Sequence, residues 1–188
     1  MLLTELKSFI QNKYNYDMTN KELSADLKKR AIALGLCRQW QRDWTTEDKS
    51  ILCDMYIDGL DFCIINNYPT TEYMKENFDG IMQNHGIYVD EKVSINGAKL
   101  LVYVINGEST GDIVLDNFDI CDVYIRHNSD INIIAKGQSS IYINVFDNAK
   151  VNVTQTGSLS RVNVYKHGDD VSIVTDGKNI QVKDGKLE

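Results

Sequence analysis

From Val93 to the end of the chain, pairs of apolar residues separated by one residue recur about every ten positions. Ten pairs follow one another: Val93/Ile95, Val102/Val104, Ile113/Leu115, Val123/Ile125, Ile131/Ile133, Ile141/Ile143, Val151/Val153, Val162/Val164, Val171/Ile173 and Ile180/Val182. Their first members span 87 residues in nine intervals, or about 9.7 residues each. Hairpin sandwiches show longer strands and stronger two-residue turn signals than this. The pattern predicts a solenoid of short stacked strands.

Small and turn-forming residues occupy fixed places between the pairs. Six residues after the start of successive strands come Ser129, Gly137, Asp147, Gly157, Gly168 and Gly177, all of types that suit tight turns. Two residues before the strands come Cys121, Ser129, Ser139, Ala149 and Ser160, all small enough for a narrow interior. Asp169 and Lys178 take this place in the last two turns. Buried charge is costly, so we expect the final coils to be splayed, frayed or a polar cap.

This spacing leaves two coil sizes open, about 20 or about 30 residues. We expect 20 residues, two strands and about five coils, with valine and isoleucine inside. The residues between them then face outward in ladders: Tyr124, Asn132, Tyr142, Asn152, Asn163, Ser172 and Gln181. The first and last coils have unpaired strand edges that recruit other chains unless they are covered. We expect the preceding segment to cover the first edge.

Residues 1–86 show helical spacing instead. Thr19 and Glu22 fit a capping box, apolar residues follow with a helical period from Leu23 to Leu34, and Gly35 suits a C-terminal cap. Further helices are expected at Thr4–Lys13, from Thr45 or Thr46 to near Gly59, and from Thr70 toward Gly86, while Leu60–Ile65 is ambiguous. The predicted fold class is therefore α+β, with a helical domain at 1–86 and a single-stranded parallel β-helix at 87–188.

The stretch from Gly137 to Val153, GQSSIYINVFDNAKVNV, resembles the decapeptide-type β-helix repeats G-x-S-x-V-x-V-x-x-x-D-x-A-x-V-x-V. Such repeats are common in proteins of phages and mobile elements, and the resemblance covers about residues 113–182. It implies a β-solenoid. It implies no catalytic residue and no single function, because these repeats serve as scaffolds, tail parts, adhesive surfaces and inhibitors.

Composition excludes several classes of partner. The 188 residues include 20 Lys+Arg and 27 Asp+Glu, a net charge of −7. An acidic chain is repelled by nucleic-acid phosphate and by anionic lipid, so we expect neither as a partner. No apolar run approaches the roughly 20 residues that cross a bilayer, and the N-terminus shows no secretion signal. We therefore expect a cytoplasmic protein whose cysteines, Cys37, Cys53, Cys63 and Cys121, are reduced and mostly buried.

The sequence offers little for catalysis. It contains three histidines, His85, His127 and His167, and none of the common nucleophile-elbow, phosphate-loop or zinc-hydrolase motifs. His127 and His167 are expected as corner residues two coils apart, too far for one metal ion. We assign no catalytic residue, metal or cofactor. The alternative is an enzyme at the junction of the helices and the first coils, with His85, Asp61 and Cys63.

Two groups of residues are candidates for an interaction surface. Arg38, Trp40, Arg42 and Trp44 place large rings and cations on one short segment, as partner hot spots do, although packing into the helical core is the alternative. Tyr124, Tyr142 and Asn152 represent the outward ladders. Rings and flat amides at strand spacing also suit a glycan.

These observations favour a non-enzymatic interaction or scaffold module that presents a rigid solenoid surface. The expected partner is a protein, or a second copy bound through the open C-terminal end. Two alternatives stay open besides the enzyme: glycan binding, and inhibition by mimicry of an acidic polymer in a protein of phage or mobile-element origin.

Overall fold

The computed structural model describes residues 18–186. The chain forms two compact units, Met1–Leu52 and Cys53–Glu188, and helix α4 (Lys49–Asp58) runs across the boundary. The predicted helix Thr4–Lys13 lies outside the described residues. The strands and the helices that immediately precede them therefore belong to one compact unit.

The first unit contains α2 (Asn20–Ala33) and α3 (Arg38–Asp43). The predicted capping box is confirmed, because Thr19 Oγ1 accepts a hydrogen bond from Glu22 N and Glu22 accepts one from Thr19 N. Helix α2 buries Leu23, Leu27 and Ala31, which recur at the expected helical spacing. Gly35, with a φ of 95°, follows the helix in the left-handed conformation that its position predicts.

In the second unit, α5 (Leu60–Ile65), α6 (Thr71–Phe78) and the 3-10 helix η1 (Met82–His85) follow α4. The ambiguous segment is thus helical. Thr70 caps α6 by accepting a hydrogen bond from Tyr73 N, as its position predicts. The expected continuation of this helix toward Gly86 is wrong, since α6 ends at Phe78 and only one 3-10 turn follows.

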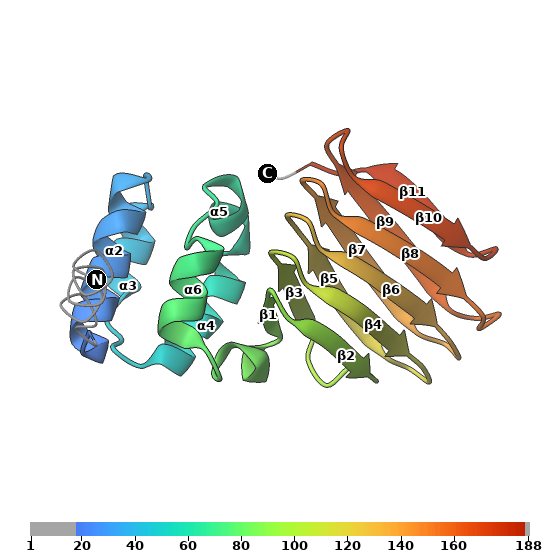
Figure 1. Ribbon diagram of the computed structural model, residues 1–188, viewed down its shortest axis with the longest axis horizontal. Coiled ribbons are helices and arrows are strands. Elements are labelled where there is room, and N and C mark those ends of the chain that lie inside the picture. Colours follow the sequence, from blue (N-terminus) through green and yellow to red (C-terminus); the bar gives the residue numbers. More distant parts are fainter. Residues whose placement is uncertain (1–17, 187–188) are drawn as a thin grey trace, which may run out of the picture. The chain divides into compact units, whose positions relative to one another are not determined.

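Eleven strands build the solenoid (Figure 1). They are β1 (Ile87–Val89), β2 (Lys92–Asn96), β3 (Val102–Asn106), β4 (Thr110–Leu115), β5 (Ile120–Ile125), β6 (Asp130–Ala135), β7 (Ser140–Phe146), β8 (Lys150–Gln155), β9 (Arg161–His167), β10 (Ser172–Asp176) and β11 (Ile180–Asp184). Odd-numbered strands form sheet A and even-numbered strands form sheet B, all paired in parallel. Ile113 pairs with Ile133 and Ile133 with Val153, which confirms the 20-residue coil of two strands.

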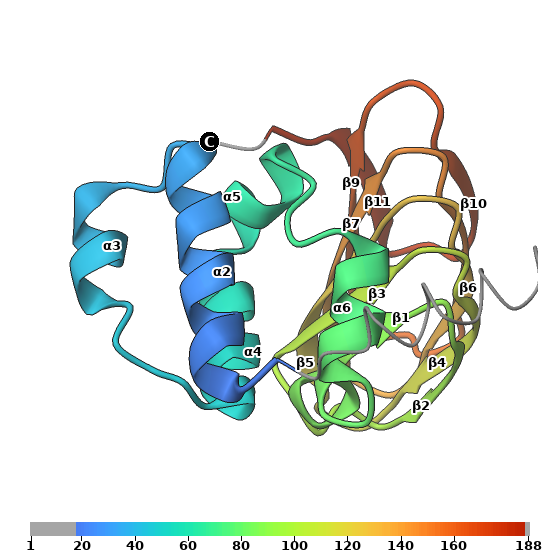
Figure 2. The same cartoon turned by 60° about the vertical axis from the view of Figure 1, so that its left-hand side comes forward.

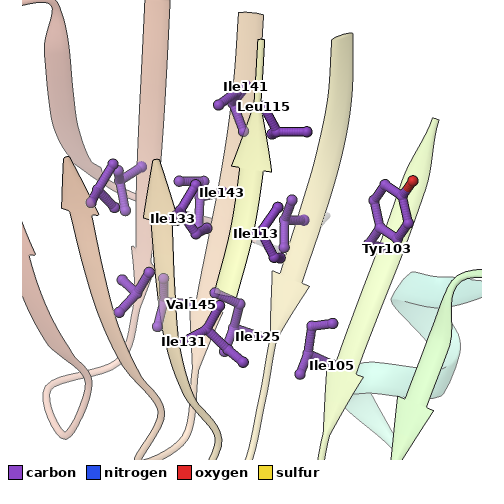
Figure 3. Packing of buried hydrophobic residues seen from close by; sticks show 14 of the residues in the cluster. Tyr103, Ile105, Ile113, Leu115, Ile125, Ile131, Ile133, Ile141, Ile143 and Val145 are labelled. Carbon is purple, nitrogen blue, oxygen red and sulfur yellow. The ribbon is translucent and has the colours of Figure 1, made fainter. Parts of the chain in front are cut away.

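The core lies between the two sheets. The inward pairs from Ile113/Leu115 to Val162/Val164 are all at most 1% exposed, as their spacing predicts. The small residues Cys121, Ser129, Ser139, Ala149 and Ser160 are equally buried. Figure 2 shows the turns of successive coils lying one above another. Figure 3 shows Ile133 and Ile143 side by side in this core, with Tyr103 at the end of the row.

One strand has the opposite register to the prediction. In β3, Tyr103 and Ile105 belong to the solenoid core, whereas Val102 and Val104 occupy outward positions in register with Asp122 and Tyr124. Val104 is nevertheless 0% exposed, so both sides of this part of β3 are buried. Burial on both sides removes the alternation that normally reveals which face is inward. Strand β1 was not expected, because it has only three residues.

The turns correct one expectation. Positive φ angles occur at Asn117, His127, Gly137 and Asp147, and Ser129 N closes its turn by donating to the carbonyl of Arg126. His127 and His167 do not share a column, because β9 is displaced by one residue and Ser140 pairs with Arg161. His167 consequently lies in register with Phe146 at the end of the strand, rather than at a corner.

The last coil remains regular in its backbone. Strand β10 pairs with β8 over five residues, and β11 pairs with β9 over five residues. Their side chains are mostly exposed. Val182, at an inward position in register with Val164, is 49% exposed because no further coil covers it in the described part of the chain, and Val174, 59% exposed, lies at an outward position in register with Asn152. The expected splaying or fraying is therefore absent from these two strands.

Candidate functional site

The tryptophan and arginine candidates all lie in the first unit. Arg38 and Arg42 are exposed on α3, while Trp40 and Trp44 are half-buried. Trp44 is anchored, because its ring Nε1 donates to Ser24 Oγ at 3.0 Å and its carbonyl accepts from Lys28 Nζ at 3.0 Å. Its indole thus joins the loop to α2, and only part of the ring surface is left for a partner.

The structure separates the two kinds of outward ladder. Tyr124 and Tyr142 lie on sheet A, whereas Asn152 lies on sheet B. On sheet B, Asn152 Nδ2 donates to Asn132 Oδ1 and Asn132 Nδ2 donates to Asp112 Oδ1, each at 3.0 Å. These amides stabilise the stack by bonding to one another from coil to coil. The amide ladder of sheet B therefore lies on a different face from the rings, whereas Asn163, in register with Tyr142, shares sheet A with them.

Sheet A carries an aromatic stack on its outer side. The ring of Phe146 lies 6.4 Å from Tyr124 and 4.1 Å from His167, with the rings nearly parallel in both pairs. Phe146 is only 4% exposed, and His167 Nε2 contacts Asn144 Oδ1 at 2.9 Å. Phe146, the central ring of the stack, is therefore packed inside the protein and offers almost no surface to a partner. Tyr142, 40% exposed on the neighbouring part of the face, is the tyrosine best placed to contact a partner.

Among the described residues, the two most exposed apolar side chains lie where the chain passes from sheet B to sheet A. Leu101 and Phe118 are each 74% exposed and Ile120 is 59% exposed. Leu101 O accepts a hydrogen bond from Asp122 N, and Asp122 pairs with Tyr142 in the next coil. Ile120 and Tyr142 are consequently diagonal neighbours on the same face. We name Leu101, Phe118, Ile120 and Tyr142 the apolar ridge.

Sequence reasoning selected Tyr142 but missed the other three ridge residues. They lie in or beside turns rather than in apolar-x-apolar pairs, so the strand pattern does not detect them. A comparison between coils does: Ile120 is in register with Ser140, and the place of Phe118 is taken by Gln138 one coil later. The available signal for these exposed residues was therefore an apolar residue at a position where the next coil has a polar one. Leu159, 63% exposed, lies in a later turn at the same corner.

A pocket of about 470 Å³ opens beside the first coil. Its lining comes from η1, from strands β1, β2 and β3 and from the loop between β2 and β3: Gln83, Asn84, Tyr88, Ser94, Ile95, Asn96, Gly97, Lys99, Leu100 and Tyr103. Tyr103 Oη accepts hydrogen bonds from the backbone N–H groups of Lys99 and Leu100, at 2.9 and 3.1 Å, and so orders the loop. Burial raises the pKa of Tyr88, which is therefore a neutral hydrogen-bonding group at physiological pH.

Where α5 meets the solenoid, a buried arginine joins helix and strand. Arg126 is 4% exposed and donates through Nη2 to the carbonyl of Ile64 at 3.4 Å. Its Nε lies 3.9 Å from Asp147 Oδ2 and has no hydrogen-bond partner. The next residue, His127, contacts Asn67 Oδ1 through Nε2 at 3.0 Å. These contacts attach the connection after α5 to one corner of the stack.

The one thiol of the alternative enzyme site, Cys63, is not ionised. Burial raises the pKa of Cys53 and of Cys63 to about 12, so both thiols are protonated at neutral pH. His85 Nδ1 pairs with Asp54 Oδ1 at 2.6 Å, so its carboxylate partner comes from α4. Asp61 is exposed on α5. Asp54 can orient His85 as a general base. Cys53 and Cys63 supply no thiolate nucleophile, because both thiols are buried and protonated.

Residues 18–186 contain neither a metal-binding cluster nor a membrane-spanning helix. No group of three or more His, Cys, Asp or Glu side chains in that range is placed to hold a metal ion. No helix in that range is both long and apolar enough to cross a membrane.

Comparison with known proteins gives no relative. The chain matches no protein-family model, and neither the curated proteins nor the solved structures yield a similar chain. The function has to be argued from the geometry.

Proposed function

We propose that this chain is a non-enzymatic protein-interaction module whose solenoid holds the apolar ridge as a rigid docking surface. The observation that supports this is that Leu101 and Phe118 lie in successive turns from sheet B to sheet A and Ile120 and Tyr142 lie on the adjacent strands β5 and β7, all at least 40% exposed. Exposed apolar groups that cluster, rather than scatter singly, are typical of interaction sites.

The solenoid backbone supports this role because it fixes the spacing of the ridge. Ile120 and Tyr142 lie on adjacent, hydrogen-bonded strands, and the inward residues beneath them, Cys121 and Ile141, are at most 1% exposed. A surface that is already ordered loses little conformational entropy when it binds. Tyrosine and phenylalanine also offer large contact areas at low entropic cost.

Charge around the ridge indicates the chemistry of the partner. Asp116 and Lys136 occupy the same place in successive coils, since Lys136 N bonds to the carbonyl of Leu115. Arg161 lies two strands from Ile120 in the same column. Both signs are present, so the ridge favours neither a polyanion nor a polycation. It fits an apolar surface of a protein with little net charge at the contact.

We also propose that the solenoid is a decapeptide-type repeat of the kind found in phages and mobile elements. The Gly137–Val153 repeat and the 20-residue coil support this assignment.

The test compares ridge variants with a variant on the other sheet. A partner recovered from the host with the wild-type chain is purified and titrated against Phe118→Ser, Tyr142→Ser and Asn152→Ser. We expect the two ridge variants to weaken binding at least about tenfold, because hot-spot truncations cost about 2 kcal/mol or more. Asn152→Ser is the matched control and should bind as the wild type does. Equal affinity of all four chains would reject the ridge as the docking surface.

A further inference from the structure

The first strand of sheet B has an unpaired edge. Strand β2 is the last member of its sheet at this end and pairs with β4. Thr110 N bonds to the carbonyl of Glu91 at 3.0 Å, and Gly97 N bonds to the carbonyl of Val114 at 2.8 Å. A strand in a parallel ladder uses alternate residues for each neighbour. Odd-numbered residues of β2 therefore face β4, and the N–H and C=O groups of Lys92, Ser94 and Asn96 face away from it.

Nothing in the described part of the chain pairs with these groups. Outside the ladder with β4, residues 18–186 contain no backbone hydrogen bond to Ser94 or Asn96. Sheet A differs at the same end, because η1 and α6 pack against its first strand, β1. The helical segment thus protects the first edge of one sheet, and the other sheet keeps a template for a further strand.

The space beside this edge is the pocket of about 470 Å³. Ser94, Ile95 and Asn96 form one side, while Gln83 and Asn84 of η1 lie among its other lining residues. Tyr88, Leu100 and Tyr103 add apolar surface. An edge with unpaired backbone groups next to a pocket for side chains is the arrangement by which proteins bind extended peptides.

We propose that β2 binds an extended segment of a partner protein, which adds to sheet B as a further strand and places an apolar side chain in the pocket. This deepens the proposed function and rests on it, since it states how a protein partner engages the module. Leu101 of the apolar ridge follows directly after Lys99 and Leu100 of the pocket, so one partner can contact both.

The charges at the edge specify the segment further. Within residues 18–186, Lys99 is the one charged residue that lines the pocket. Lys92 of β2 has Asp112 of β4 as a diagonal neighbour, because Asp112 is in register with Ser94. Glu91 accepts a hydrogen bond from Gln83 Nε2 at 2.5 Å. The complementary segment therefore alternates apolar residues with polar ones and carries an acidic side chain for Lys99.

The decisive variant removes one edge donor without affecting the fold. Proline at an edge position whose N–H points away from the sheet costs no ladder bond. Ser94→Pro thus removes the outward N–H and leaves the bonds between β2 and β4. Ser94→Thr is the matched control, because it keeps this N–H and suits a strand.

The probe is a pool of random twelve-residue peptides displayed on phage and selected on the full chain, from which one enriched peptide is synthesised. We expect enrichment of alternating apolar sequences with an acidic residue. Ser94→Pro should bind the peptide at least about tenfold more weakly, and Ser94→Thr should match the wild type, with all three chains melting alike. Amide exchange at Ser94 and Asn96 should be fast in the free chain and slow in the complex.

Several outcomes overturn the inference. They are slow exchange at Ser94 in the free chain, equal peptide affinity of the wild type and Ser94→Pro, and the absence of any peptide that needs this edge. The natural partner separates the two proposals. If Phe118→Ser loses it and Ser94→Pro keeps it, the ridge function stands and the strand addition fails. If Ser94→Pro loses the partner and Phe118→Ser keeps it, the ridge is rejected as the docking surface and the strand addition to β2 is supported.

Discussion

At the scale of single residues, His127 shows how one side chain can serve a turn and a contact between helix and strand together. Its backbone has a φ of 59°, and its Nδ1 accepts a hydrogen bond from Gly107 N at 3.1 Å. Burial lowers the pKa of His127, and the Arg126 guanidinium lowers it further. Asp147, Asp90 and Glu72 act in the opposite direction but do not outweigh them. The folded chain therefore favours the neutral ring.

This lowered pKa predicts a stability that depends on pH. The unfolded chain binds a proton at His127 below its ordinary pKa of about 6.5, where the folded chain does not yet do so. The contribution of the neutral His127 ring to the free energy of unfolding is therefore complete above that pKa. It is lost as the pH falls from there toward the lower pKa of His127 in the folded chain. We expect His127→Asn to lose less unfolding free energy than the wild type between pH 7.5 and 5.5, measured in urea. Asparagine tolerates the positive φ, and an identical loss in both chains would contradict the assignment.

At the scale of elements, Gly111 marks the one inward place of β4 that the repeat leaves without a side chain. It stands in register with Val93 and Ile131, both of which are core residues. Its φ is 148°, and a Cβ built there would collide with the carbonyl of Val93. At this φ the Cβ of an L residue would point at the backbone of β2, so the position requires glycine.

The repeat and the structure make opposite predictions for Gly111→Val. A consensus argument expects stabilisation, because valine and isoleucine fill the column elsewhere. We expect destabilisation by about 1–3 kcal/mol or more, since overpacking adds to backbone strain. Urea unfolding checks this, with Ile131→Val in the same column as the control, expected to cost about 0.5–1.5 kcal/mol. A Gly111→Val chain as stable as the wild type would show that β2 can move away.

At the scale of the whole molecule, the solenoid core of the second unit does not include the buried residues of α2 in the first unit. Leu23, Leu27 and Ala31 pack in the first unit, each at most 3% exposed. The solenoid core of the second unit extends from Val93 to Val164. Each unit can therefore lose its structure with an energy of its own.

Hydrogen exchange can separate the two units. Leu27→Ala and Ile143→Ala should each cost about 2–5 kcal/mol, because both remove buried methyl groups. We expect Leu27→Ala to accelerate exchange in α2 and not in β7, and Ile143→Ala to do the reverse. Equal acceleration of both segments in either variant would mean that the two units unfold as one.

The ridge and the β2 edge show why candidate sites were harder to predict than the fold. Tyr142 was recognised because it alternates with buried isoleucines on its strand. Phe118 and Leu101 are single apolar residues at turns, where no period distinguishes exposure from burial. The free groups of Ser94 depend on which strand is first in the sheet and on where η1 lies. No local pattern contains that information.

By itself, the amino-acid sequence determined the repeat: short stacked strands about ten residues apart and most of their inward residues. The register between strands then decided for a coil of 20 residues over one of 30. The sequence could determine the repeat because every coil must repeat the same inward column, so the physical constraint is periodic along the chain. Tertiary structure alone decided that Val104 is buried on the outer side, that Asn163 lies beside Tyr142 on sheet A while Asn152 lies on sheet B, and that one sheet edge is covered. These features depend on contacts between distant segments, which leave no period in the sequence.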